Sequence, residues 1–144
     1  MKALVFLLAV SFLSGCVSLS RSDEEALRVI KSSGFSEEHN SLKSPLLAGS
    51  LNILPGIGNF YLASGTNESS QWTYGFLNLL FWPASVLWGV PQASIDAVSI
   101  NKKETVYYFN NTSQGKAEMA GRLKQSSNSD DSTSKPAGAK NELF

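Results

Sequence analysis

Two side chains with reactive chemistry occur only once in this 144-residue sequence, the thiol of Cys16 and the imidazole of His39. A single cysteine excludes an intrachain disulfide and a cysteine-based metal site. A thiol can instead be acylated, and the place of Cys16 favours that chemistry. An apolar run of 11 residues, Ala3–Leu13, precedes it and itself follows Lys2. Because a bilayer span needs about 20 residues, this run is typical of a secretory signal peptide.

The four residues that end at this cysteine are Leu13, Ser14, Gly15 and Cys16. They resemble the lipobox of bacterial lipoproteins, in which a branched residue and two small residues precede the cysteine. The resemblance implies that residues 1–15 are a signal peptide, that signal peptidase II recognises Leu13, Ser14 and Gly15, and that Cys16 carries fatty acyl groups such as palmitate. Two acyl chains give stable anchoring, since each buried methylene contributes about 0.8 kcal/mol. The alternative is an ordinary signal peptide and a free thiol.

The same resemblance implies a location in the bacterial cell envelope. Val17 follows the cysteine, at the position where an aspartate would resemble an inner-membrane retention signal of enteric bacteria. Val17 therefore favours the outer membrane slightly and leaves the inner membrane open.

Charge is balanced overall but unevenly distributed. The chain has 12 basic and 12 acidic residues, and loss of Lys2 with residues 1–15 leaves 11 against 12, a net charge of −1. Such a balance creates no field that attracts nucleic acid. Between Ser44 and Ile95 the only charged side chain is that of Glu68. We therefore expect an apolar middle between polar ends.

Residues 16–43 predict a lipidated tether followed by a short amphipathic helix. Ser22 and Glu25 have the spacing of a capping box, and Gly34 is placed to end the helix. Leu27 and Ile30 lie on its apolar face. That face packs on a neighbouring element or binds a partner.

Residues 44–109 predict an apolar, kinked helical hairpin. Pro55 and Gly56 interrupt its first segment. Its second segment contains 17 uncharged residues, Tyr74–Val90. As one helix they would be roughly 26 Å long, close to the hydrocarbon thickness of a bilayer. Pro83 and Pro91 predict kinks. A stripe of small residues that would let another helix approach closely consists of Ser85, Gly89, Ala93 and Ala97.

Two stretches of this region, Pro55–Gly65 and Leu87–Asp96, resemble the TM2 domain. The first is similar to its Gly-x-Gly-x-x-Phe-Tyr-Leu-Gly stretch, and the second to the end of its second helix. The resemblance covers residues 46–103 and implies a two-helix transmembrane hairpin without a chemical activity. The structural positions that it carries over are Gly56, Gly58, Phe60, Tyr61 and Asp96.

Asp96 has two interpretations. Inside the hydrocarbon its charge would be costly and would suggest a function. At a helix end beside Lys102 and Lys103 it would be an ordinary interfacial group, which is the interpretation we favour. Lys43, Lys102 and Lys103 flank the hairpin on the exported side, against the positive-inside tendency. An inner-membrane hairpin, a shallow hairpin under the lipid anchor and a hairpin buried in an oligomer all stay open.

The C-terminal residues 110–144 predict a polar, largely disordered tail. Before it, Thr105–Phe109 has the composition of a short strand or of an aromatic cap on the hairpin. Ser113–Gln125 predicts a polar helix. From Ser126 onward the composition is too polar to offset the entropy of ordering. The fold class that we predict is therefore mainly α.

No catalytic constellation is evident. His39, beside Glu37 and Glu38, reads as a solvated loop residue, and the sequence contains neither a nucleophile elbow nor a phosphate loop. We predict a non-enzymatic, lipid-anchored envelope protein with a structural or assembly role and with no metal, cofactor or nucleic acid. Its partners are membrane lipid and either further copies or an envelope protein. The alternatives are an accessory subunit of a secretion or transport complex and, less favoured, a pore-forming protein.

Overall fold

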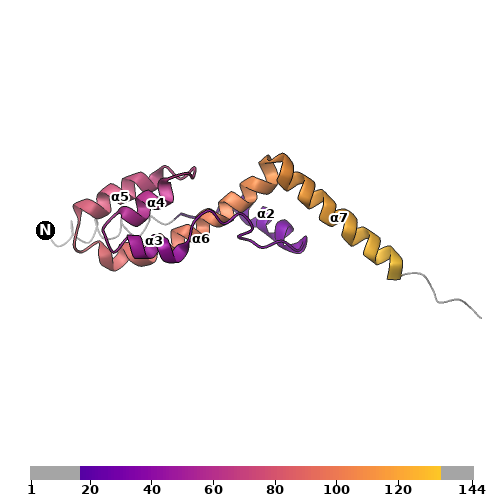
Figure 1. Cartoon of the computed structure of the whole chain (residues 1–144), viewed down its shortest axis with the longest axis horizontal. Coiled ribbons are helices and arrows are strands. Elements are labelled where there is room, and N and C mark those ends of the chain that lie inside the picture. Colours follow the sequence, from indigo (N-terminus) through magenta and orange to yellow (C-terminus); the bar gives the residue numbers. More distant parts are fainter. Residues whose placement is uncertain (1–16, 134–144) are drawn as a thin grey trace, which may run out of the picture.

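The computed structural model describes residues 17–133, the side chains of 126–133 excepted, and this part of the chain is all-helical. The predicted mainly α fold class is thereby confirmed. Figure 1 shows an elongated molecule, with three short helices gathered around the start of a long one and the last helix extending from the opposite end. In chain order the helices are α2 (Arg21–Ser32), α3 (Pro45–Leu51), α4 (Ile57–Ala63), α5 (Ser70–Leu80), α6 (Val86–Asn111) and α7 (Ser113–Thr133).

Helix α2 begins two residues earlier than predicted. Ser20, and not Ser22, is the N-cap, because its hydroxyl accepts a hydrogen bond from the Asp23 amide at 3.2 Å. The Asp23 carboxylate accepts the Ser20 amide at 3.1 Å in return and completes the capping box. The helix ends at Ser32, and Gly34 follows it with a φ of 83°, as expected for a left-handed residue after a helix.

The apolar middle of the chain forms four helices where two were predicted. Residues 52–56 separate α3 from α4, so the predicted break at Pro55 and Gly56 is confirmed. The uncharged run Tyr74–Val90 is also divided, because α5 ends at Leu80 and α6 begins only at Val86. Pro83 lies in that interval, where it removes a backbone donor and disfavours a helical residue before it.

The expected transmembrane helix is therefore wrong. Within residues 17–133 no helix is both long enough and apolar enough to cross a membrane. Helix α5, with its 11 residues, is about 16 Å long. Helix α6 is longer, but Asp96, Lys102 and Lys103 lie within it. The two-helix transmembrane hairpin implied by the TM2 resemblance is therefore also wrong.

Helices α3 and α6 pack antiparallel at close range. Near one end of the pair, Asn52 donates from its side chain to the carbonyl of Gly89 at 2.6 Å. Near the other, Asn101 holds the backbone of Lys43, which precedes α3. A Cβ on Gly49 would collide with the side chain of Ser94. All four residues of the predicted small stripe, Ser85, Gly89, Ala93 and Ala97, are buried, and Pro91 lies inside α6 without ending it.

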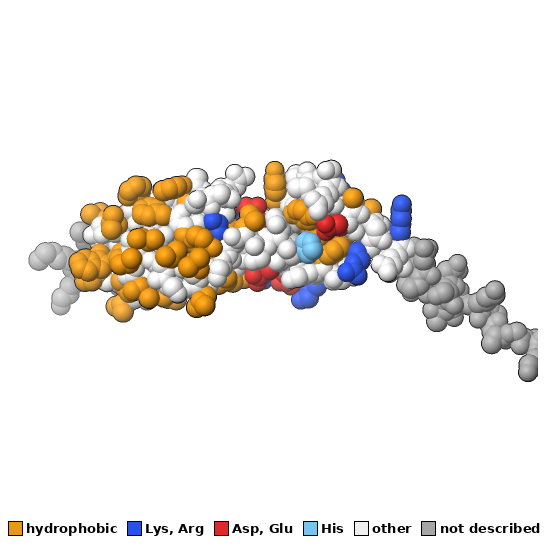
Figure 2. Space-filling model, in the orientation of Figure 1, with side chains coloured by type: hydrophobic (Ala, Val, Ile, Leu, Met, Phe, Trp, Pro, Cys, Tyr) orange, Lys and Arg blue, Asp and Glu red, His pale blue; other side chains and the backbone are white. Residues whose placement is uncertain are grey.

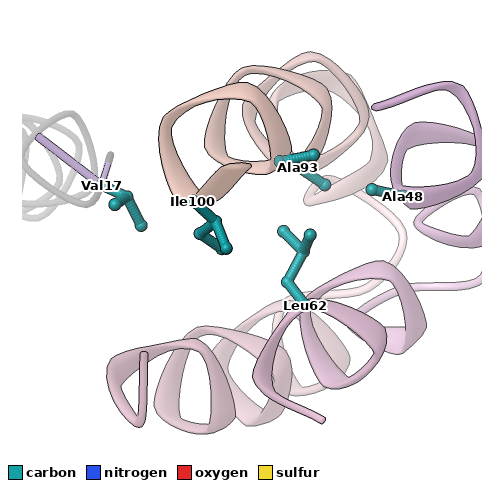
Figure 3. Close-up of a cluster of buried hydrophobic side chains, with 6 residues drawn as sticks. Val17, Ala48, Leu62, Ala93 and Ile100 are labelled. Atoms are coloured by element: carbon teal, nitrogen blue, oxygen red, sulfur yellow. The ribbon is translucent and has the colours of Figure 1, made fainter. Parts of the chain in front are cut away.

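The buried hydrophobic side chains form two separate clusters. The first joins Val17 to α3, α4 and α6 (Figure 3) and consists of Val17, Ala48, Leu62, Ala93, Ala97 and Ile100. The second joins α2 to the later part of α6 and consists of Leu27, Ile30, Val106 and Phe109. Val17, which directly follows Cys16 in the sequence, therefore belongs to the core, whereas Ser18 and Ser20 are exposed.

The C-terminal part of the described chain is more helical than predicted. Thr105–Phe109 belongs to α6 and forms no strand, because Thr105, Val106 and Phe109 are buried on one face of that helix. Helix α7 contains the predicted polar helix and continues to Thr133, so the disorder expected from Ser126 is wrong as far as that residue. Residues 134–144 of the predicted tail lie outside the described residues.

A pair of glycine substitutions tests the junction between α4 and α5. Gly56 and Gly65 both have a positive φ, of 83° and 73°. A Cβ on Gly65 would meet no atom within 4 Å, whereas a Cβ on Gly56 would collide with the backbone carbonyl of Gly75 in α5. We expect Gly65→Ala to lower the free energy of unfolding by about 1–2 kcal/mol through backbone strain alone. Gly56→Ala should lower the free energy of unfolding by about 1–3 kcal/mol more than Gly65→Ala does, because the added methyl group overpacks against α5.

Urea unfolding in mild detergent, followed by circular dichroism, measures both free energies. Equal losses in the two variants would contradict the close approach of Gly56 to α5.

Candidate functional site

A chain of buried polar side chains runs through the helices of the apolar middle. It consists of Trp88, Asn78, Asn59, Gln71 and Asp96, which we call the polar ladder. The indole of Trp88 donates to Asn78 Oδ1 at 3.2 Å, and Asn78 Nδ2 donates to Asn59 Oδ1 at 2.8 Å. Asn59 Nδ2 then donates to Gln71 Oε1 at 2.7 Å, and Gln71 Nε2 donates to Asp96 Oδ2 at 3.0 Å.

The chemistry of the two ends sets the direction of the polar ladder. An indole N–H can only donate, and both side-chain oxygens of Asp96 accept hydrogen bonds, from Gln71 and from Val17. Each of the three amides between Trp88 and Asp96 must therefore point its NH₂ group toward Asp96. Hydrogen bonds aligned in this way polarise one another and gain strength in a low-dielectric interior. The polar ladder thus connects α4, α5 and α6 by directional bonds.

Asp96 is fully buried, with 0% of its surface exposed, and the favoured interpretation as an interfacial group is wrong. Its Oδ1 accepts the backbone amide of Val17 at 2.7 Å. Burial raises the pKa of the Asp96 carboxyl above its ordinary value of 3.8, while the bonds from Gln71 and Val17 oppose that rise and the charge of Glu68 adds to it. Among the described residues, no cation forms an ion pair with this carboxylate.

A second polar arrangement holds the loop before α3 against α6. The side chain of Asn101 accepts the Lys43 amide at 2.9 Å and donates to the Lys43 carbonyl at 2.7 Å. The Lys43 ammonium donates to the carbonyls of Tyr61 and Ser64 at the end of α4, and it lies 4.5 Å from the centre of the Tyr61 ring. A cation at this end of a helix is favourable. Burial lowers the pKa of Lys43 below its ordinary 10.5.

The surface around the polar ladder is apolar. Figure 2 shows hydrophobic side chains covering the end of the molecule formed by α3, α4, α5 and the start of α6, with charged side chains on the remainder. We call residues 44–95 the apolar end. Its most exposed large hydrophobic side chains come from α3, α5, α6 and the turns between the helices: Leu46, Ile53, Leu54, Phe76, Leu79, Leu80, Trp82, Leu87 and Ile95.

The site residues singled out in the sequence fall into two groups. Leu13, Ser14, Gly15 and Cys16 lie outside the described residues, so the signal peptide and the lipidation site stay predictions. The others surround the polar ladder. Gly58 lies against the backbone of Ala48, Phe60 packs its ring against Trp72 and Phe76, and the Tyr61 hydroxyl accepts the Ser44 amide at 3.0 Å.

His39 lies in the loop after α2, beside aromatic side chains and Glu118. Its ring packs near Phe35, Phe109 and Tyr108, with centroid distances of 5.2–5.8 Å, and its Nε2 lies 3.3 Å from Glu118. His39 is exposed in the turn between α2 and α3, as expected for a solvated loop residue, and its ring also packs against these aromatic side chains. In the described part of the chain, no group of three or more potential metal ligands comes together.

Sequence reasoning missed the amides of the polar ladder. Gln71 and Asn78 were available as a signal, because they are seven residues apart and so share one face of a helix. No such spacing pointed to Asn59, because its two partners, Gln71 and Asn78, lie on another helix, α5. Uncharged polar residues within an apolar segment were the feature to follow, because each needs a hydrogen-bonding partner when buried.

Removal of one amide tests the polar ladder. Gln71→Met keeps the approximate size of the side chain but leaves both Asp96 Oδ2 and Asn59 Nδ2 without their partner. Since an unsatisfied buried polar group costs about 1–3 kcal/mol, we expect the free energy of unfolding to fall by about 2–6 kcal/mol. Gln114→Met on exposed α7 is the matched control and should change it by less than about 0.5 kcal/mol. Similar losses in both variants would contradict the ladder.

The raised pKa of Asp96 predicts a pH dependence with a defined sign. Between the ordinary pKa of 3.8 and the raised value, the folded protein binds more protons than the unfolded chain. Stability contributed by protonated Asp96 is therefore present below that window and is lost as the pH rises through it. We expect the free energy of unfolding of the native protein, relative to Asp96→Asn, to decrease as the pH is raised from about 3 to 7.

Denaturant unfolding of both proteins at each pH measures this difference, in which the contributions of all other titrating groups cancel. A difference that grows with pH would show that Asp96 is stabilised in its ionised form.

Comparisons of the sequence with protein families and with curated proteins, and of the structure with solved structures, gave no match.

Proposed function

We propose that this chain is a lipid-anchored protein of the bacterial envelope, with a structural or assembly role and no catalysis, whose apolar end lies in one leaflet of a membrane. The observation that carries the proposal is the inverted distribution of side chains at that end. Large hydrophobic side chains are exposed there, for example Leu87 at 84%, while Asn52, Asn59, Gln71 and Asp96 are buried.

An inverted distribution suits a lipid environment. In water, burial of apolar side chains drives folding, and amides such as those of Asn and Gln are mostly exposed. In hydrocarbon, apolar side chains gain nothing by turning inward, and polar groups must satisfy one another. The polar ladder does this for Asn59, Gln71, Asn78 and Asp96. The close antiparallel approach of α3 and α6 through Gly49 and Gly89 is the packing that helices use in such an environment.

Lipid explains the exposed surface better than a single protein partner does. The exposed side chains come from α3, α4, α5, α6 and the intervening turns, so they do not form one groove or one face. Acyl chains can cover such a surface from all sides. A patch of this extent otherwise marks a protein interface, which is the alternative of an accessory subunit in a secretion or transport complex.

The dimensions of the helices favour insertion into one leaflet. Helix α5 is about 16 Å long, which is roughly half of the 30 Å hydrocarbon thickness. Glu68 lies just before α5, on the side of the apolar end that is opposite the α5–α6 turn. Its carboxylate pairs with the Lys103 ammonium at 2.7 Å. Charged side chains thus begin where a shallow insertion would end. Of the three arrangements left open by the sequence, this is the shallow hairpin under a lipid anchor.

Vesicle binding by the unacylated protein tests the apolar end alone. A chain that starts at residue 16 and carries Cys16→Ser should bind vesicles of phosphatidylethanolamine and phosphatidylglycerol, and brominated lipids should quench its tryptophan fluorescence. Leu54→Asp with Leu87→Asp should weaken binding about 100-fold or more. Each exposed leucine contributes about 1.5–3 kcal/mol in hydrocarbon, and 1.4 kcal/mol corresponds to a factor of ten.

The control exchanges two exposed hydrophobic side chains that lie away from the apolar end. Val29 and Leu123 are 59% and 57% exposed, so Val29→Asp with Leu123→Asp introduces the same charges away from the apolar end. This variant should bind as the parent does. Absence of quenching in the parent, together with stoichiometric crosslinks between Leu54 or Leu87 and one envelope protein, would overturn the lipid proposal in favour of the accessory subunit.

A further inference from the structure

Val17 is held in the core by its backbone amide and by its side chain. Its amide donates to Asp96 Oδ1 at 2.7 Å, and its side chain, 9% exposed, packs in the first hydrophobic cluster with Ala97 and Ile100. Figure 3 shows Val17 beside α6, next to Ile100. A residue that connects a lipid anchor to a domain would ordinarily lie in a flexible, exposed tether. Here the position directly after Cys16 is part of the folded structure.

The place of Val17 along α6 coincides with the border of the apolar end. Ile95, one residue before Asp96, is an exposed hydrophobic side chain, and Lys102 and Lys103 follow within two turns. The neighbour of Val17 along the chain is Cys16, and consecutive Cα atoms are 3.8 Å apart. No other residue separates that neighbour from the core.

We propose that the hydrogen bond from the Val17 amide to Asp96 is a latch that joins the acylated cysteine to the folded core without a tether, so that the acyl chains and the apolar end enter the same leaflet. This inference rests on the proposed function, since it needs a modified Cys16. It assigns Asp96 a positioning role for the lipid anchor. A flexible tether would let the apolar end contact a second membrane or a distant partner, whereas the latch excludes both.

The bonding pattern of Asp96 fits a latch. One carboxylate oxygen accepts Gln71, the last amide of the polar ladder, and the other accepts Val17. Val17 is thereby connected to α4, α5 and α6 through a single side chain, that of Asp96. After Val17, the next three residues lead directly into α2, whose N-cap is Ser20. Ser18 and Ser20 are already exposed, so opening the latch would release Val17 and leave residues 17–20 as a mobile tether before Arg21.

Limited trypsin cleavage at Arg21 measures the latch. The full chain is expressed in bacteria, labelled with an alkyne analogue of palmitate and treated with trypsin in isolated membranes. Cleavage after Arg21 separates the label from the domain. Asp96→Leu removes the acceptor and should raise the cleavage rate at least tenfold. Asp96→Asn keeps one acceptor oxygen for two donors, the Val17 amide and Gln71 Nε2, so its rate should lie between those of the native protein and Asp96→Leu.

A second variant breaks the same bond from the other side. Val17→Pro removes the donor and leaves Asp96 in place, so it should match Asp96→Leu. Circular dichroism shows whether each variant is folded. If Asp96→Leu does not fold, Val17→Pro decides the outcome, and hydrogen exchange of the Val17 amide in the native protein gives the same answer without any substitution.

The outcomes for the latch and for the lipid anchor are separable. Native cleavage as fast as that of folded Asp96→Leu or Val17→Pro, or rapid exchange of the Val17 amide, would overturn the latch. Loss of the label in Cys16→Ser is expected. Absence of label from the native protein would instead remove the lipid anchor, whereas the cleavage rates, read by mass spectrometry of the released segment, would still report on the Val17–Asp96 bond.

Discussion

Helices that present apolar side chains outward must be held together by something other than the burial of those side chains. In this molecule that role falls to hydrogen bonds between buried polar groups. The indole of Trp88 can only donate and Asp96 accepts, so they orient the amides of Asn78, Asn59 and Gln71 between them. The arrangement of α4, α5 and α6 depends on this constraint, because a one-residue shift of any helix would separate several partners at once.

Close backbone approach is the second condition for such a structure. Polar side chains as short as asparagine reach across helices only if the helix axes are near one another. Gly89 permits this, since a Cβ there would collide with the amide of Asn52 and crowd that of Asn78. The small stripe on α6 and the polar ladder are thus two parts of one packing solution. Dispersion forces act between the backbones, and directional bonds act between the side chains.

Local signals predicted the elements, and tertiary contacts decided the rest. Composition and proline placement were sufficient for the helical class and for the break at Pro55, because they act within one turn of the chain. Ser20 and Asp23 form the capping box in place of Ser22 and Glu25, because an aspartate can also accept the hydrogen bond from the N-cap amide. The burial of Asp96 had no local signal. Two of its partners, Val17 and Gln71, are 79 and 25 residues away, and only the fold brings them to Asp96.

Helix α6 joins two environments with a single continuous backbone. Its first half contributes Ala93 and Ala97 to the cluster under the apolar end, and its second half contributes Val106 and Phe109 to the cluster with α2. From Ile95 to Asn111 the helix rises about 24 Å. With the apolar end in a leaflet, α7 therefore begins well beyond the lipid surface. A rigid connection of this length suits a protein that presents a polar helix at a fixed distance from the membrane, and a flexible linker would lose that geometry.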